Sequence, residues 1–144
     1  MTRAVLFDAA GTLVELVEPV GATYARVAAE HGVSLPAWRL GDAFARIVRR
    51  MPPMCFPDVA VADVPARERA WWRDLVRQVV RATDGTAQFA DFEAFFAGLW
   101  EHYAGARGWR LRAGAPEALA TLAARGLALG VASNFDHRLP KILD

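Results

Sequence analysis

The stretch Ala4-Val-Leu-Phe-Asp8-Ala-Ala-Gly11-Thr12-Leu-Val14 decides the fold of this 144-residue chain. Its apolar run, Ala4–Phe7, is too short for a helix and predicts a strand buried on both faces, as strands of parallel sheets are. Gly11 then allows a tight reversal that other residues would resist. Asp8 is therefore predicted at the carboxyl end of a central strand, the edge where open α/β sheets bind their ligands.

Asp8 has two interpretations at this point. A carboxylate held on rigid backbone at the end of a strand can act as a nucleophile. Alternatively, its side chain caps the turn that follows. The stretch by itself favours neither interpretation.

A second stretch, Leu127-Ala-Leu-Gly-Val-Ala-Ser133-Asn134, repeats the pattern of an apolar strand that ends in polar residues. An amphipathic helix is predicted before it at Ala115–Arg125, with Pro116 near its start and Gly126 just after its end. Strand, helix and strand in this order predict a parallel sheet. Asp8 and Ser133 would then lie side by side, where a carboxylate, a hydroxyl and free backbone N–H groups can attack a phosphorus atom and hold its oxygens.

A long helical segment separates the two predicted strands. Apolar residues at helical spacing predict a helix from Pro19 to His31, a second one up to Met51, a third at Ala66–Thr83 that closes near Gly85, and a fourth from Asp91 to Tyr103. Four helices with apolar stripes predict a small bundle. The proline-rich segment 54–65 is predicted to be a surface loop.

Composition and charge limit the classes of function that this chain can have. Apolar residues make up 54% of the chain, enough for a sizeable core. The net charge of +1 argues against nucleic acid or an anionic membrane as a partner. A single cysteine, Cys55, excludes an internal disulfide and fits a reducing compartment. Without a signal peptide pattern or an apolar stretch of roughly 20 residues, the chain is expected to be soluble and cytoplasmic.

The two strand-end motifs resemble a known family. Phe7-Asp8-Ala9-Ala10-Gly11-Thr12-Leu13 resembles the first motif of the haloacid dehalogenase-like hydrolase superfamily, and Val131-Ala132-Ser133-Asn134 resembles its second motif. Ser133-Asn-Phe-Asp-His-Arg-Leu139, together with Trp71-Trp72 and Phe56-Pro57, is similar to the rhythmically-expressed-gene-like branch. The resemblance implies an α/β fold: a partial Rossmann-like core of parallel strands, with a helical bundle cap inserted between the motifs.

The resemblance also implies a chemistry. In phosphatases of this superfamily the first aspartate attacks the phosphoryl group of a small phosphorylated substrate, and Asp8 matches that nucleophile. Thr12 would support the loop, while Ser133 and Asn134 would receive phosphate. Mg²⁺ would be held by Asp8 and the backbone carbonyl of Ala10.

Two features depart from the family pattern. The superfamily's second aspartate protonates the leaving group, and Ala10 occupies that position. Loss of a general acid–base group costs a factor on the order of 10² to 10⁴ in rate. The lysine and acidic pair that the superfamily places well beyond the second motif have no clear match, since Lys141 follows Ser133 too closely. The sequence thus predicts weak or no turnover.

Asp136 is interpreted as a cap of the helix that follows Ser133.

Three functional hypotheses remain open. The first is a hydrolase of phosphatase ancestry. The second is a 2-haloacid dehalogenase, in which Asp8 would displace halide without a metal; that class resembles a pattern with Tyr at the place of Ala10. The third is a non-catalytic remnant domain that binds a partner protein. Magnesium dependence separates the first two, and Asp8→Asn separates both from the third.

The expected domains are a discontinuous core, residues 1–16 and 108–144, and a helical cap, residues 17–107. A core with only two parallel strands is hard to stabilise in isolation. We therefore predict that the chain, as a fragment or natural truncation, associates with another copy or leaves apolar surface exposed. Sedimentation measures this association directly. A compact monomer without an exposed apolar patch would contradict the prediction.

Overall fold

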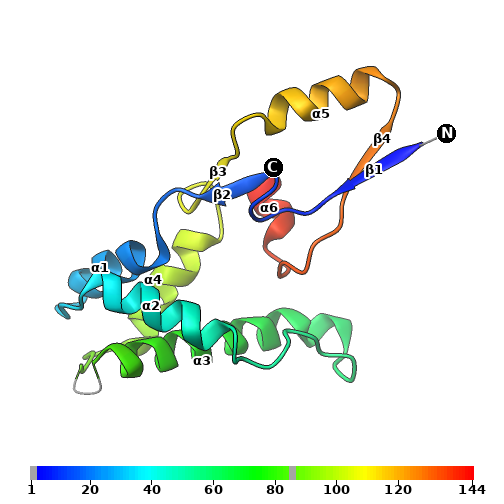
Figure 1. The fold of residues 1–144 in the computed structure, drawn as a ribbon. Coiled ribbons are helices and arrows are strands. Elements are labelled where there is room, and N and C mark those ends of the chain that lie inside the picture. The colour runs from blue at the N-terminus through cyan, green and yellow to red at the C-terminus, as the bar shows by residue number, and fades with distance from the viewer. Residues whose placement is uncertain (1–2, 85–86) are drawn as a thin grey trace. The chain divides into compact units, whose positions relative to one another are not determined.

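The computed structural model describes residues 3–84 and 87–144 and divides into two compact units (Figure 1). One unit comprises the chain up to Val17 together with Ala104–Asp144, and the other is Glu18–Tyr103. The β-strands of the described residues belong to the first unit, and helices α1 to α4 make up the second.

A parallel pair of strands forms the centre of the first unit. β1 (Ala4–Phe7) and β4 (Ala128–Val131) run side by side in the register Ala4↔Ala128 to Phe7↔Val131 (Figure 1). Helix α5 (Ala115–Ala124) precedes β4 and begins with Pro116 in its first turn. The predicted α/β class with parallel, partial Rossmann-like core strands is confirmed.

The prediction that β1 is central and buried on both faces was wrong. Leu6 is 69% exposed, and Val131 on the neighbouring strand is 41% exposed. The apolar composition of β1 indicated burial, but burial needs layers on both sides of a sheet. Because this sheet has two strands, neither strand has neighbours on both edges.

A second, antiparallel sheet was not predicted. β2 (Val14–Leu16) pairs with β3 (Trp109–Leu111), with Val14 opposite Leu111 and Leu16 opposite Trp109. Across this pair the guanidinium of Arg110 donates to the carboxylate of Glu15 at 2.8 Å. A strand of three residues is too short for the alternation of apolar and polar residues to be recognised in the sequence. In addition, the pairing joins segments that are far apart in the chain.

The second unit contains the four helices that the sequence predicted. They are α1 (Val20–Glu30), α2 (Ala37–Val48), α3 (Val64–Thr83) and α4 (Phe92–Tyr103). Segment 54–65 is a loop except for a 3₁₀ turn at Val61–Asp63 and the first residues of α3. Gly85, predicted to close α3, lies outside the described residues. Among the described residues, no helix is both long and apolar enough to cross a membrane.

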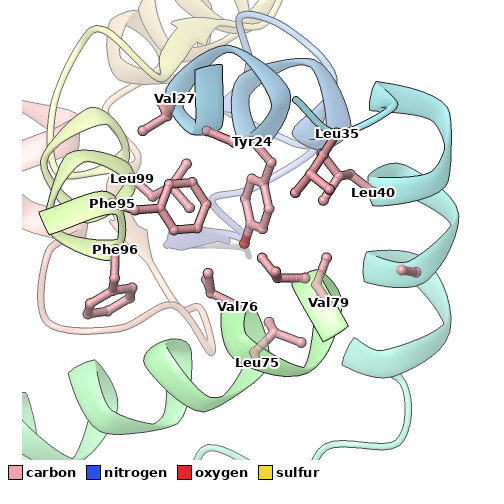
Figure 2. Packing of buried hydrophobic residues seen from close by; sticks show 13 residues of the cluster. Tyr24, Val27, Leu35, Leu40, Leu75, Val76, Val79, Phe95, Phe96 and Leu99 are labelled. Carbon is pink, nitrogen blue, oxygen red and sulfur yellow. The ribbon is translucent and has the colours of Figure 1, made fainter. Parts of the chain in front are cut away.

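The helices of this unit enclose one apolar core (Figure 2). Helix α2 packs against both α1 and α3, and α1 packs against α4. Each helix contributes large side chains with almost no exposed surface, among them Tyr24, Leu40, Leu75, Val79, Phe95, Phe96 and Leu99. Burial of such side chains contributes about 1.5–3 kcal/mol each, so the core is the main source of stability in this unit.

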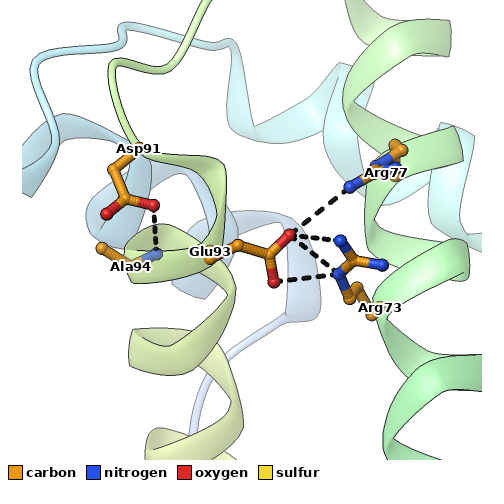
Figure 3. Close-up of polar contacts among 5 residues, drawn as sticks. All are labelled: Arg73, Arg77, Asp91, Glu93 and Ala94. Atoms are coloured by element: carbon orange, nitrogen blue, oxygen red, sulfur yellow. Dashed lines mark hydrogen bonds and ion pairs between the residues drawn. The ribbon is translucent and has the colours of Figure 1, made fainter.

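Polar contacts complete the packing of α3 and α4 (Figure 3). Before α4, the carboxylate of Asp91 accepts the N–H of Ala94 at 2.9 Å, which satisfies a helix-terminal donor. Glu93 accepts hydrogen bonds from Arg73 and lies 3.5 Å from Arg77, both on α3. The hydrogen bond from Arg73 lowers the pKa of Glu93. Because this group of charges is exposed, it contributes little to stability.

Helices α1 and α2 lie close together at Gly21. A Cβ atom added there would lie 2.1 Å from the carbonyl oxygen of Ala37 and 2.7 Å from the backbone nitrogen of Gly41. Both atoms belong to the backbone, so no side-chain rotation can relieve the overlap. Glycine costs about 1 kcal/mol relative to alanine in a helix interior, and here the helix crossing requires it.

We therefore expect Gly21→Ala to destabilise the helical unit by about 1–3 kcal/mol, because α1 and α2 must separate to admit the methyl group. Gly41→Ala is the matched control, since a Cβ there would meet only the Cα of Gly21 at 4.0 Å. That variant should be neutral or more stable by up to about 1 kcal/mol. Urea unfolding of both variants measures the difference. Equal midpoints for the two would contradict the close helix crossing.

Candidate active site

Asp8 follows β1 directly and lies on an exposed loop. Ala9 beneath it is fully buried, and its carbonyl oxygen accepts the N–H groups of Thr12, Leu13 and Val14 at 2.8–3.2 Å. Gly11 makes this reversal possible with a backbone φ of +83°, a conformation that favours glycine. The loop is thus anchored at Ala9 and leaves the Asp8 side chain accessible.

The Asp8 carboxylate takes part in its own turn. One of its oxygens accepts the backbone N–H of Ala9 at 2.8 Å. This contact matches the capping interpretation, but the side chain remains exposed to solvent. A fixed carboxylate with an accessible oxygen is also what a nucleophile needs, so one geometry is compatible with both interpretations.

Ser133 and Asn134 lie on the loop after β4. The N–H of Ala132 donates to the carbonyl of Phe7 at 2.9 Å, which continues the strand pairing up to the start of this loop. Ser133 is half-buried, and its Oγ accepts the N–H of Phe135 at 3.3 Å. Asn134 is exposed.

The strand register brings the two loops to one edge of the sheet. Phe7 pairs with Val131, so Asp8 and Ser133 both follow the carboxyl ends of neighbouring parallel strands. Thr12 is exposed on the turn of the first loop, and its N–H donates to Ala9. An acid and a hydroxyl thus follow the carboxyl ends of two neighbouring strands, the edge at which open α/β sheets bind their ligands.

Sequence reasoning missed the segment that supports both loops. Arg112, just after β3, donates its N–H to the carbonyl of Leu13 at 2.9 Å and its Nη1 to the carbonyl of Gly11. On the same segment, the ring of Trp109 meets that of Phe135 edge to face at 5.2 Å. The alternation Trp-Arg-Leu-Arg after Gly108 was the only sequence signal, and it does not reveal which loops the segment contacts.

The interpretation of Asp136 as a helix cap was also wrong. Helix α6 (Leu139–Leu143) is preceded by Arg138, and no side chain caps it. Asp136 is instead 3% exposed and pairs with Arg138, which is 8% exposed. Removing one partner of a buried ion pair typically costs 3–5 kcal/mol in stability. The loss of either Asp136 or Arg138 should therefore destabilise this loop.

The residues around Asp8 offer oxygen atoms that could contribute to a metal site. Within residues 3–84 and 87–144, no three His, Cys, Asp or Glu side chains are placed to hold a metal. Mg²⁺ commonly uses one or two carboxylates and completes its oxygen shell with substrate phosphate and water. The Asp8 carboxylate and the Ala10 carbonyl are oxygen donors of this kind.

The fold and the site define an α/β protein with Rossmann-like parallel strands and a helical unit inserted between these strands in the sequence. The family model for haloacid dehalogenase-like hydrolases matches residues 2–144, and the chain belongs to this family.

Curated relatives carry the same family name. The chain is 33% identical over 147 residues to "Haloacid dehalogenase-like hydrolase domain-containing protein 3" of Bos taurus, covering 99% of this chain and 55% of the relative. It is 31% identical to the Xenopus laevis protein of that name, covering 98% of the chain and 57% of the relative. The chain therefore spans little more than half the length of these relatives.

Proposed function

We propose that this chain carries the nucleophile and the phosphate-receiving loop of a phosphatase-type hydrolase that acts on a small phosphorylated substrate. The observation that carries the proposal is the β1–β4 register, which places Asp8 and Ser133 after neighbouring parallel strands. Membership of the hydrolase family supports the same assignment.

In the proposed reaction an Asp8 carboxylate oxygen attacks phosphorus, and the bond from phosphorus to the leaving oxygen breaks. The product is an aspartyl-phosphate, which water then hydrolyses to free phosphate and the original carboxylate. The Ser133 hydroxyl and the Asn134 N–H would donate to the phosphoryl oxygens, while Thr12 supports the loop. Donors fixed in this way stabilise the charge that develops in the transition state.

Asp8 and the Ala10 carbonyl would hold Mg²⁺ in this proposal. A carboxylate and a phosphate oxygen about 4 Å apart repel each other by about 4 kcal/mol per charge pair at an effective dielectric constant near 20. A bound divalent cation supplies the positive charge that offsets this repulsion.

Ala10 limits the rate in this proposal. The leaving oxygen needs a proton, and a methyl side chain cannot provide one, so solvent must do so. The expected penalty is on the order of 10² to 10⁴ in rate. The chain should therefore still bind phosphate and Mg²⁺, although it turns substrate over slowly.

The helical unit Glu18–Tyr103 has a role in the same proposal. It is inserted in the chain between the Asp8 loop and the Ser133 loop. We assign it the function of a cap that helps to choose the substrate.

A phosphatase screen with and without Mg²⁺ tests the role of Asp8. Asp8→Asn keeps the shape of the side chain but removes the nucleophilic carboxylate, so it should abolish any magnesium-dependent phosphate release. Glu117→Gln is the matched control, since it removes an exposed carboxylate of α5 in the same unit and should leave the rate unchanged.

The other outcomes separate the competing functions. Phosphate release that survives Asp8→Asn would remove Asp8 from the mechanism. Halide release from a 2-haloacid without metal would identify a dehalogenase instead. A chain that neither binds inorganic phosphate nor turns over either substrate would support a non-catalytic binding domain.

Restoring an acid at position 10 tests the proposed cause of weak turnover. Ala10 is exposed, so Ala10→Asp introduces a carboxyl group without burying it. We expect kcat to rise on the order of 10²-fold or more, because the leaving group regains a proton donor. Ala10→Asn has the same size without a titratable proton and should not raise kcat. Equal effects of the two substitutions would refute the explanation.

A further inference from the structure

The loop after β4 contains a buried ion pair that the proposed chemistry does not use. The Nε of Arg138 donates to Oδ1 of Asp136 at 2.8 Å, and its Nη2 donates to Oδ2. The backbone N–H of Arg138 also donates to Oδ1, at 3.0 Å. The residues around the pair are more open, since Asn134 and His137 are exposed.

This pair joins residues two positions apart, so it cannot tie distant elements together. It fixes the direction of the backbone just before α6, where the N–H of Leu139 also donates to the carbonyl of Asp136 at 3.1 Å. Burial of an ion pair is weak evidence for added stability, because desolvation offsets the attraction. A role in setting conformation explains the pair better than a role in stability.

The pair is one of two anchors for a short span of backbone. The other anchor is the bond from the Ala132 N–H to the carbonyl of Phe7 on β1. Only Ser133, Asn134 and Phe135 lie between the anchors. Phe135 is held in turn by its contact with Trp109 and by its N–H bond to the Ser133 Oγ.

We propose that Asp136 and Arg138 are positioning residues that fix the loop on which Ser133 and Asn134 receive phosphate. The inference rests on the proposed function, because it takes Ser133 and Asn134 as the phosphate-binding groups. Asp136 itself is not a candidate nucleophile, since both of its oxygens accept bonds from Arg138 and the residue is buried.

Arg138→Lys is the test variant, since it keeps the positive charge but cannot form the bidentate hydrogen bond to the Asp136 carboxylate. The control is Arg110→Lys, which alters an exposed ion pair with Glu15 in the same unit. Amide hydrogen exchange of the peptide 132–139 reports the order of the loop. Inhibition of magnesium-dependent phosphate release by inorganic phosphate, or direct phosphate binding if turnover is absent, reports its function.

For Arg138→Lys we expect faster exchange confined to 132–139 and phosphate affinity weakened on the order of 10- to 10²-fold, as expected when a hydrogen bond to a charged ligand is lost. The melting temperature and the Arg110→Lys variant should change little.

Three results would overturn the inference. Unchanged exchange in 132–139 would show that the pair does not order the loop. Faster exchange across the whole chain would show a general stabilising role. Unchanged phosphate affinity, with a loosened loop, would show that the loop does not need this order to bind phosphate. A wild-type chain that binds no phosphate at all would instead refute the proposed function, and this inference with it.

Discussion

The parallel pairing of β1 with β4 is the interaction on which the candidate site depends. Asp8 and Ser133 are separated by most of the chain, and the register from Ala4↔Ala128 to Phe7↔Val131 makes the strand ends neighbours. Parallel strands present their carboxyl ends at the same edge, so the side chains that follow them gather there. A shift of this register would separate the proposed nucleophile from the proposed phosphate loop.

Strand pairing alone does not set the conformation of the two loops. The Asp8 loop is folded over the buried Ala9 and held by Arg112. The Ser133 loop is held by Trp109 through Phe135 and by the buried pair of Asp136 and Arg138. The short strand β3 and the residue after it therefore contact both loops and help to hold them.

In the proposed function, phosphate binding and proton transfer depend on different residues. The groups proposed to attack and to hold phosphate are present at one edge of the sheet, whereas position 10 carries a methyl group. Binding of an anion depends on positioned donors and on a cation, and neither needs a titrating side chain at that position. Fast turnover, by contrast, benefits from a side chain that donates a proton to the leaving group. In the proposed function, Ala10 is therefore the residue to which we assign the weak turnover.

Local patterns in the sequence predicted most of the secondary structure of this protein. Helical spacing of apolar residues predicted α1 to α5 within a few residues, and the two apolar runs that end in Asp8 and Ser133 predicted β1, β4 and their parallel order. These features follow from periodicity and turn residues, which act over a few neighbouring positions. Only the tertiary structure decided the pairing of β2 with β3, the exposure of Leu6, the contacts of Arg112 and the burial of Asp136 with Arg138. Each of these features depends on which segments, far apart in the sequence, come into contact in the folded chain. Patterns among neighbouring residues do not predict such contacts.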